Sequence, residues 1–197
     1  MIDTIIASGC SFTFGSELSD DNGEIPSRKT WSSHLCNEIQ VNYICVAKGG
    51  IGNSAIARKI FQQISTMTNC DNVGVIAMWS LPSRYDWAMP AHELLEEGRW
   101  ASITPYDTTT HQKKGKNKVK ASKSVLDAFI RRREHYEKTK VSVFADILFR
   151  YASNRYHEAY LDWKSIIWIQ NILEKKNIPY MFTLADNRLF YEHESLI

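Results

Sequence analysis

The chain has 197 residues and a net charge of +2 at pH 7, with 44% hydrophobic and 12% aromatic residues. This composition excludes an intrinsically disordered chain and gives no general electrostatic basis for binding nucleic acid. The length suits one domain with a full hydrophobic core. No apolar stretch approaches the roughly 18 residues of a membrane-spanning helix, and no signal peptide is visible, so we expect a cytoplasmic protein that does not bind membranes.

Four cysteines are scattered along the chain without the Cys-x-x-Cys or Cys/His spacing of a zinc site. We therefore expect free thiols in a reducing compartment, no bound metal and no cofactor. The sequence also lacks the Gly-x-Gly-x-x-Gly pattern of dinucleotide-binding turns and the Gly-Lys-Ser/Thr of a P-loop, which disfavours a nucleotide-binding domain.

The first apolar run, near residues 2–8, predicts a buried strand that Gly9 ends. Ser11 should then lie at the carboxyl edge of a sheet, where open α/β sheets bind their ligands. We therefore predict Ser11 as a nucleophile, and a Gly/Ser turn with a purely structural role is the alternative. Cys10 is interpreted as a small buried hydrophobic residue rather than as a rival nucleophile.

The second predicted strand, near residues 42–47, leads into a glycine-rich turn and then a helix. In such a layout, backbone N–H groups and the N-terminus of the helix can face an anion or a developing oxyanion. The alternative is that Asn53 or Ser54 only caps the helix.

A third buried strand, near residues 73–79, is followed by a polar turn that contains Arg84. Three roles stay open for Arg84: donor to an oxyanion, clamp for a substrate carboxylate, or partner in a surface ion pair. Because parallel strands align their carboxyl ends, we predict one shallow pocket bordered by Ser11, Gly50 and Asn53, with Arg84 at its rim.

Residues 88–124 lose hydrophobic periodicity, and we interpret them as an insertion or lid. The lysine-rich stretch 113–118 lies within this segment. It is interpreted as a solvated loop rather than as a patch for nucleic acid or an anionic polysaccharide.

The rest of the chain completes an α/β pattern. Spacing predicts helices over 125–133, 141–151 and 157–176, and a fourth strand near 179–184. Apolar runs separated by amphipathic helices predict a single domain over residues 1–197, a three-layer α/β/α sandwich with a parallel sheet.

The sequence Gly-Cys-Ser-Phe-Thr-Phe-Gly at residues 9–15 resembles the first block of the SGNH (GDSL-type) hydrolases, with Cys10 where Asp is commoner. Gly50-Ile51-Gly52-Asn53 resembles their second block, and the segment from Trp79 to Arg84 resembles a subset often encoded by phages. The resemblance implies a flavodoxin-like sheet, Ser11 as the nucleophile, and hydrolysis of a small-molecule or glycan ester, as in O-deacetylases.

Two family features are missing. The Gly-x-Asn-Asp block, whose Asn is an oxyanion donor, does not occur, and neither does the C-terminal Asp-x-x-His, since Leu189 stands where His belongs after Asp186. His193 lies near carboxylates and is the candidate base. We expect a C-terminally incomplete hydrolase domain that is inactive or weak; the alternative is a non-catalytic SGNH-like binding or virion protein.

Overall fold

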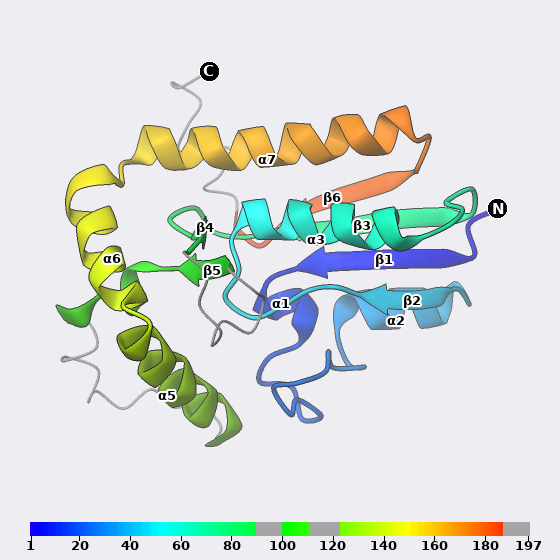
Figure 1. Ribbon diagram of the computed structural model, residues 1–197. Helices are drawn as coiled ribbons and strands as arrows, with labels where there is room; N and C mark the ends of the chain where they lie inside the picture. Colours follow the sequence, from blue (N-terminus) through cyan, green and yellow to red (C-terminus); the bar gives the residue numbers. More distant parts are fainter. Residues whose placement is uncertain (90–99, 111–122, 187–197) are drawn as a thin grey trace.

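The computed structural model describes residues 1–89, 100–110 and 123–186, so His193 and the stretch 113–118 lie outside the described residues. Its main strands are β1 (Thr4–Gly9), β2 (Asn42–Cys45), β3 (Val73–Trp79) and β6 (Tyr180–Leu184). They form one four-stranded parallel sheet in the order β2-β1-β3-β6 (Figure 1). The predicted parallel sheet is confirmed, although β2 ends at Cys45 rather than at residue 47.

The side chains of β1 alternate between two cores on opposite faces of the sheet. Ile6 belongs to the larger core, which contains α3 (Asn53–Thr66) and α7 (Arg155–Lys175). Ile5 and Ala7 belong to a smaller core with α2 (Trp31–Glu38). Figure 1 shows α3 and α7 together over one face and α2 at the other. Helices therefore flank the sheet as a three-layer α/β/α arrangement requires.

The spacing of isoleucines explains how α3 packs on the sheet. Ile56, Ile60 and Ile64 lie four residues apart and are at most 1% exposed. Residues at this spacing share one face of a helix, and burying each such side chain contributes about 2 kcal/mol. This face fixes the direction of α3, and hence the place of the turn that precedes it.

A hairpin and several helices outside the main sheet follow β3 in the chain. The strands β4 (Tyr85–Ala88) and β5 (Trp100–Ile103) pair in an antiparallel hairpin, so part of the predicted insertion is a strand. The 3₁₀ turn η1 (Pro105–Asp107) follows β5, and α5 (Lys123–Lys138), α6 (Val141–Ile147) and the π turn η2 (Leu148–Ala152) precede α7. Tyr85, Ile103 and Val141 share a separate core between this hairpin and these helices. No helix in the described ranges has both the length and the apolar character of a membrane span.

Candidate functional site

Ser11 lies directly after a tight turn from strand to helix. β1 ends at Gly9, and Ser11 is the first residue of the short helix α1 (Ser11–Phe14). A Cβ atom on Gly9 would lie 2.2 Å from Oγ1 of Thr13, so the turn requires glycine at this position. Ser11 is partly exposed, whereas Cys10 is fully buried, as expected for a small hydrophobic residue. The turn thus leaves Ser11 partly exposed to solvent and buries the Cys10 thiol.

The turn between β2 and α3 lies beside this strand end. The backbone N–H of Val46 donates to Ala7 O at 2.8 Å, and that of Lys48 donates to Gly9 O at 3.2 Å. Gly50 adopts φ +79°, in the left-handed region that favours glycine. The structure therefore brings the turn that carries Gly50 next to the end of the strand that leads into Ser11.

Asn53 lies in the interior rather than on the predicted pocket surface. The residue is 0% exposed, and its side-chain oxygen accepts from Ser80 N at 2.7 Å while its Nδ2 donates to Ser80 O at 3.2 Å. This pair of hydrogen bonds ties the end of β3 to the first residue of α3. Both polar atoms of the amide are used in the fold, which leaves no surface role for Asn53.

The N-terminus of α3 is capped by a carboxylate on the strand β4. Asp86 on β4 accepts from Gly52 N at 3.2 Å, Ala55 N at 2.9 Å and Ser54 Oγ at 2.8 Å. Anionic side chains are favoured at this end of a helix, because its first N–H groups lack partners within the helix. Asp86 could not be predicted as a cap, since no residue close to it in sequence indicates one.

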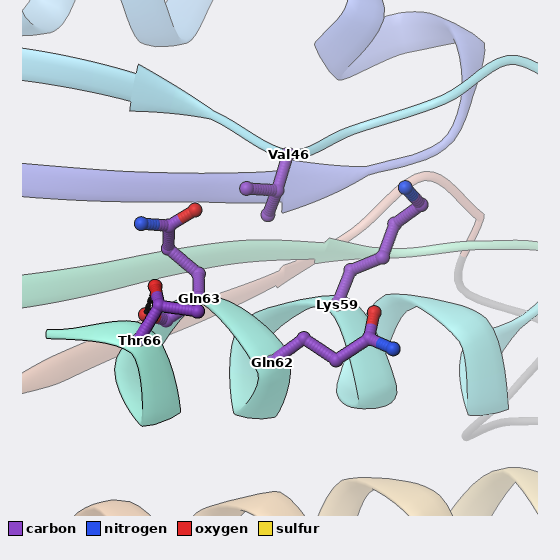
Figure 2. Close-up of a pocket in the computed structure, with 5 residues that line it drawn as sticks. All are labelled: Val46, Lys59, Gln62, Gln63 and Thr66. Atoms are coloured by element: carbon purple, nitrogen blue, oxygen red, sulfur yellow. Dashed lines mark hydrogen bonds between the residues drawn. The ribbon is translucent and has the colours of Figure 1, made fainter. Parts of the chain in front are cut away.

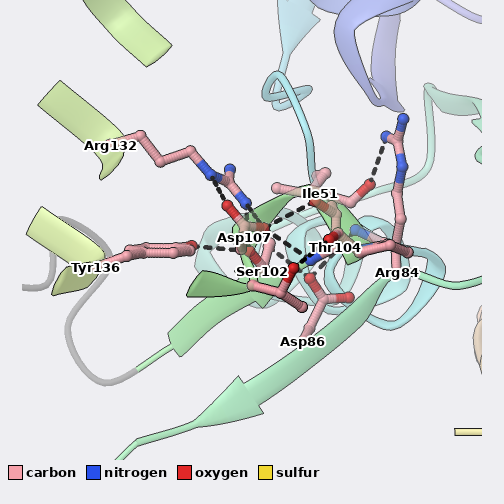
Figure 3. Close-up of polar contacts among 11 residues, drawn as sticks. Ile51, Arg84, Asp86, Ser102, Thr104, Asp107, Arg132 and Tyr136 are labelled. Carbon is pink, nitrogen blue, oxygen red and sulfur yellow. Dashed lines mark hydrogen bonds and ion pairs between the residues drawn. The ribbon is translucent and has the colours of Figure 1, made fainter. Parts of the chain in front are cut away.

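Arg84 lines a pocket of about 170 Å³ at the carboxyl end of β3. Residues 81–84 form one wall, and residues 104–106, which follow β5, form the other. The Nη1 atom of Arg84 donates to Ile51 O at 3.3 Å, in the same turn as Gly50. Figure 3 shows the guanidinium turned away from Asp86. Arg84 therefore links this pocket to the glycine-rich turn.

A polar network holds α5 against the β4–β5 hairpin (Figure 3). Arg132 donates from Nε to Asp107 Oδ1 at 3.0 Å and from Nη2 to Oδ2 at 2.8 Å, and Tyr136 donates to Ser102 O at 2.7 Å. A Cβ atom on Gly50 would lie 3.0 Å from Nη1 of Arg132, so the guanidinium also contacts the glycine-rich turn. In the sequence, Arg132 lies within a run of arginines that is typical of a solvated helix face.

Asp162 is a buried carboxylate on α7. The residue is 6% exposed, and its Oδ2 has no hydrogen-bond partner among the described residues. Burial raises the pKa of Asp162 to about 8; the Asn53 amide lowers this pKa, and the nearby charges of Asp86 and Glu158 raise it further. With this pKa, Asp162 is mostly protonated at neutral pH and below.

A second pocket, of about 230 Å³, lies between the end of β2 and α3 (Figure 2). Its lining consists of Val46, Lys59, Gln62, Gln63 and Thr66. These side chains include no acid, imidazole or thiol. Neither of these two pockets is lined by Ser11 or Gly50, which the prediction placed around one pocket with Arg84. We place the candidate site at the carboxyl edge because hydrogen bonds join the glycine-rich turn both to the end of β1 and to Arg84.

The histidines of the described residues lie on α2, α5 and α7. His34 is exposed on α2, His135 contacts the ring of Tyr136 on α5, and His157 stacks on Tyr85 with ring centroids 6.5 Å apart. His193, the predicted base, lies outside the described residues. Within the described ranges, no group of three or more His, Cys, Asp or Glu side chains is placed to hold a metal ion.

No model of a known protein family matches this chain, and no curated protein matches it either.

Proposed function

We propose that the chain is an SGNH-like serine esterase or acyl hydrolase domain that acts on a small-molecule or glycan ester, with Ser11 as its nucleophile. The observation that supports this most directly is the position of Ser11, partly exposed after a tight turn at the carboxyl edge of β1. The glycine-rich turn with Gly50 is hydrogen-bonded to that same strand end. A hydroxyl beside backbone N–H groups is the minimum arrangement for acyl transfer.

The reaction would proceed in two steps. A base takes the proton of Ser11 while its Oγ attacks the ester carbonyl, and the alcohol leaves with a proton as the acyl-serine forms. Water then attacks the acyl-serine, and the carboxylic acid leaves. The Gly50 N–H, with Arg84 next to its turn, is our proposed donor to the oxyanion. His193 is the proposed base.

A non-catalytic binding protein is the second candidate, and the hydrogen bonds around α3 favour it. The amide of Asn53 is used by Ser80, and the N–H of Gly52 is used by Asp86. Two donors of this turn that could have faced an oxyanion are therefore used to hold the fold. In this alternative the same edge binds its ligand without turnover.

The two candidates are separated by covalent labelling and by turnover. A fluorophosphonate reagent adds to a nucleophilic serine, so the hydrolase proposal expects a slow mass increase that Ser11→Ala removes. The matched control is Ser16→Ala, because Ser16 lies in the same segment and should leave labelling unchanged. Hydrolysis of p-nitrophenyl acetate should be slow, close to the roughly 10³ to 10⁴-fold enhancement over water that remains without a complete triad.

Labelling or turnover that persists in Ser11→Ala would contradict the assignment of the nucleophile. Faster turnover that disappears in His193→Ala would identify His193 as an effective base. Absence of both labelling and turnover would favour the binding protein.

A further inference from the structure

The pocket beside Arg84 has rigid, mostly apolar walls. Pro82 and Pro105 lie on its two sides, and proline rings fix the backbone φ angle. Leu81 and the ring of Tyr106 complete the apolar lining. Its volume of about 170 Å³ is below the range of roughly 300 to 1,000 Å³ typical of sites that enclose a whole ligand. The pocket therefore suits one chemical group of a larger molecule.

The turn that carries Arg84 is held in place through the residue before it, Ser83. Ser83 adopts φ +64°, which costs a residue other than glycine about 1 kcal/mol. Its hydroxyl donates to Glu158 Oε2 at 2.8 Å, and this bond holds the strained turn against α7. Strained residues next to a binding group are often found where a ligand is clamped. The turn thus fixes where the side chain of Arg84 leaves the backbone, and the hydrogen bond to Ile51 O holds its guanidinium.

Arg84 forms no salt bridge with a carboxylate in the described part of the chain. Asp86 accepts from the N-terminus of α3, and Glu158 accepts from the hydroxyls of Ser83, Tyr85 and Ser153. Among the described residues, the hydrogen bond to Ile51 O is the one that Arg84 makes from its side chain. A guanidinium has five N–H donors, so most of them stay available to a ligand.

We propose that this pocket binds a small anionic group of the ligand, a carboxylate or a phosphate, through Arg84. A guanidinium pairs with either group through two parallel hydrogen bonds, and partial burial strengthens such a pair. If the chain is the hydrolase proposed above, this anion site implies that the substrate is an acidic ester, such as an acylated sugar acid. This conclusion about the substrate rests on the proposed function. The binding of the anion itself does not depend on Ser11.

The test is direct binding to the full chain, followed by NMR on backbone amides and arginine side chains. The probes are glucuronate, inorganic phosphate and, as the neutral match for glucuronate, glucose. Glucuronate, phosphate or both should shift the signals of Ser83, Thr104 and Arg84, and glucose should not. Binding only of glucuronate assigns the site to carboxylates, and binding only of phosphate assigns it to phosphorylated ligands.

Variants decide whether Arg84 is the binding group. Arg84→Gln should weaken anion binding at least about tenfold, because a hydrogen bond to a charged group is lost, and Arg84→Lys should retain part of it. Arg133→Gln is the matched control, since Arg133 is paired on the exposed face of α5 with Glu137. Anion binding unchanged in Arg84→Gln, or equal binding of glucose, would overturn the proposal. Anion binding without labelling of Ser11 would support the anion site and contradict the proposed hydrolase function.

Discussion

Replacing Asp162 by Asn should change how the stability of this protein depends on pH. Asp162 is 6% exposed, and burial raises its pKa from 3.8 to about 8. In the unfolded chain the carboxyl loses its proton near its ordinary value of about 3.9. Between these two values the folded protein holds a proton that the unfolded chain has released.

The sign and the size of the effect follow from this difference. Because the folded state binds more protons, the free energy of unfolding falls as pH rises from about 4 to about 8, and it changes no further above that window. Each pKa unit corresponds to about 1.4 kcal/mol, so the full window is worth on the order of 5 kcal/mol. That loss is comparable to the total stability of a small domain, about 5 to 15 kcal/mol.

Urea denaturation at pH 5, 6, 7 and 8 measures the effect. Asn has nearly the size of Asp and stays uncharged, so Asp162→Asn should remove the contribution of this group and gain several kcal/mol over the parent chain at pH 8. Asp71→Asn, at an exposed carboxyl, is the control and should follow the parent profile. If Asp162→Asn and the parent lose stability in parallel across this range, Asp162 is not the group responsible for the loss.

Two further predictions concern the turns around the site. Asp86→Ala removes the cap of α3 and should lower the free energy of unfolding by about 2 kcal/mol, measured in urea, with Asp86→Asn losing less because one acceptor oxygen remains; unchanged stability would show that water replaces the cap. Gly50→Ala should cost more than Gly23→Ala. Both glycines have φ close to +80°, at +79° and +78°, but a Cβ on Gly50 would meet Arg132 whereas the space around Gly23 is open. Equal losses in thermal unfolding would exclude a role for the Arg132 contact.

The sheet could be predicted because its signal is local. β3 is a nearly continuous apolar run, as a strand covered on both faces must be, and Gly9 marks the end of β1. The placement of Ser11 after that strand followed from the same pattern. The hairpin strand β5 has only four residues, Trp100–Ile103, which is too short for an alternation of polar and apolar residues to show.

The supports of the candidate site could not be predicted, because they join distant parts of the chain. Asp86 caps a helix that begins more than 30 residues before it. The turn before Asn53 resembles an oxyanion turn, which predicts Asn53 at a pocket surface. This prediction is wrong, because Asn53 is buried and hydrogen-bonded to Ser80, 27 residues away. Asp162 lies in a helix with apolar residues around it, and none of its neighbours in sequence indicates that it is buried.

The pairing of Asn53 with residue 80 engages only main-chain atoms of the latter. Any amino acid other than proline at position 80 offers the same N–H and C=O, whereas no other residue type at position 53 reproduces both a donor and an acceptor at that length. The two positions therefore differ in which amino-acid substitutions they can accept. Ser80 is 1% exposed, so the side chain at position 80 is limited by its size but not by hydrogen bonding, whereas position 53 requires the amide that holds the end of β3.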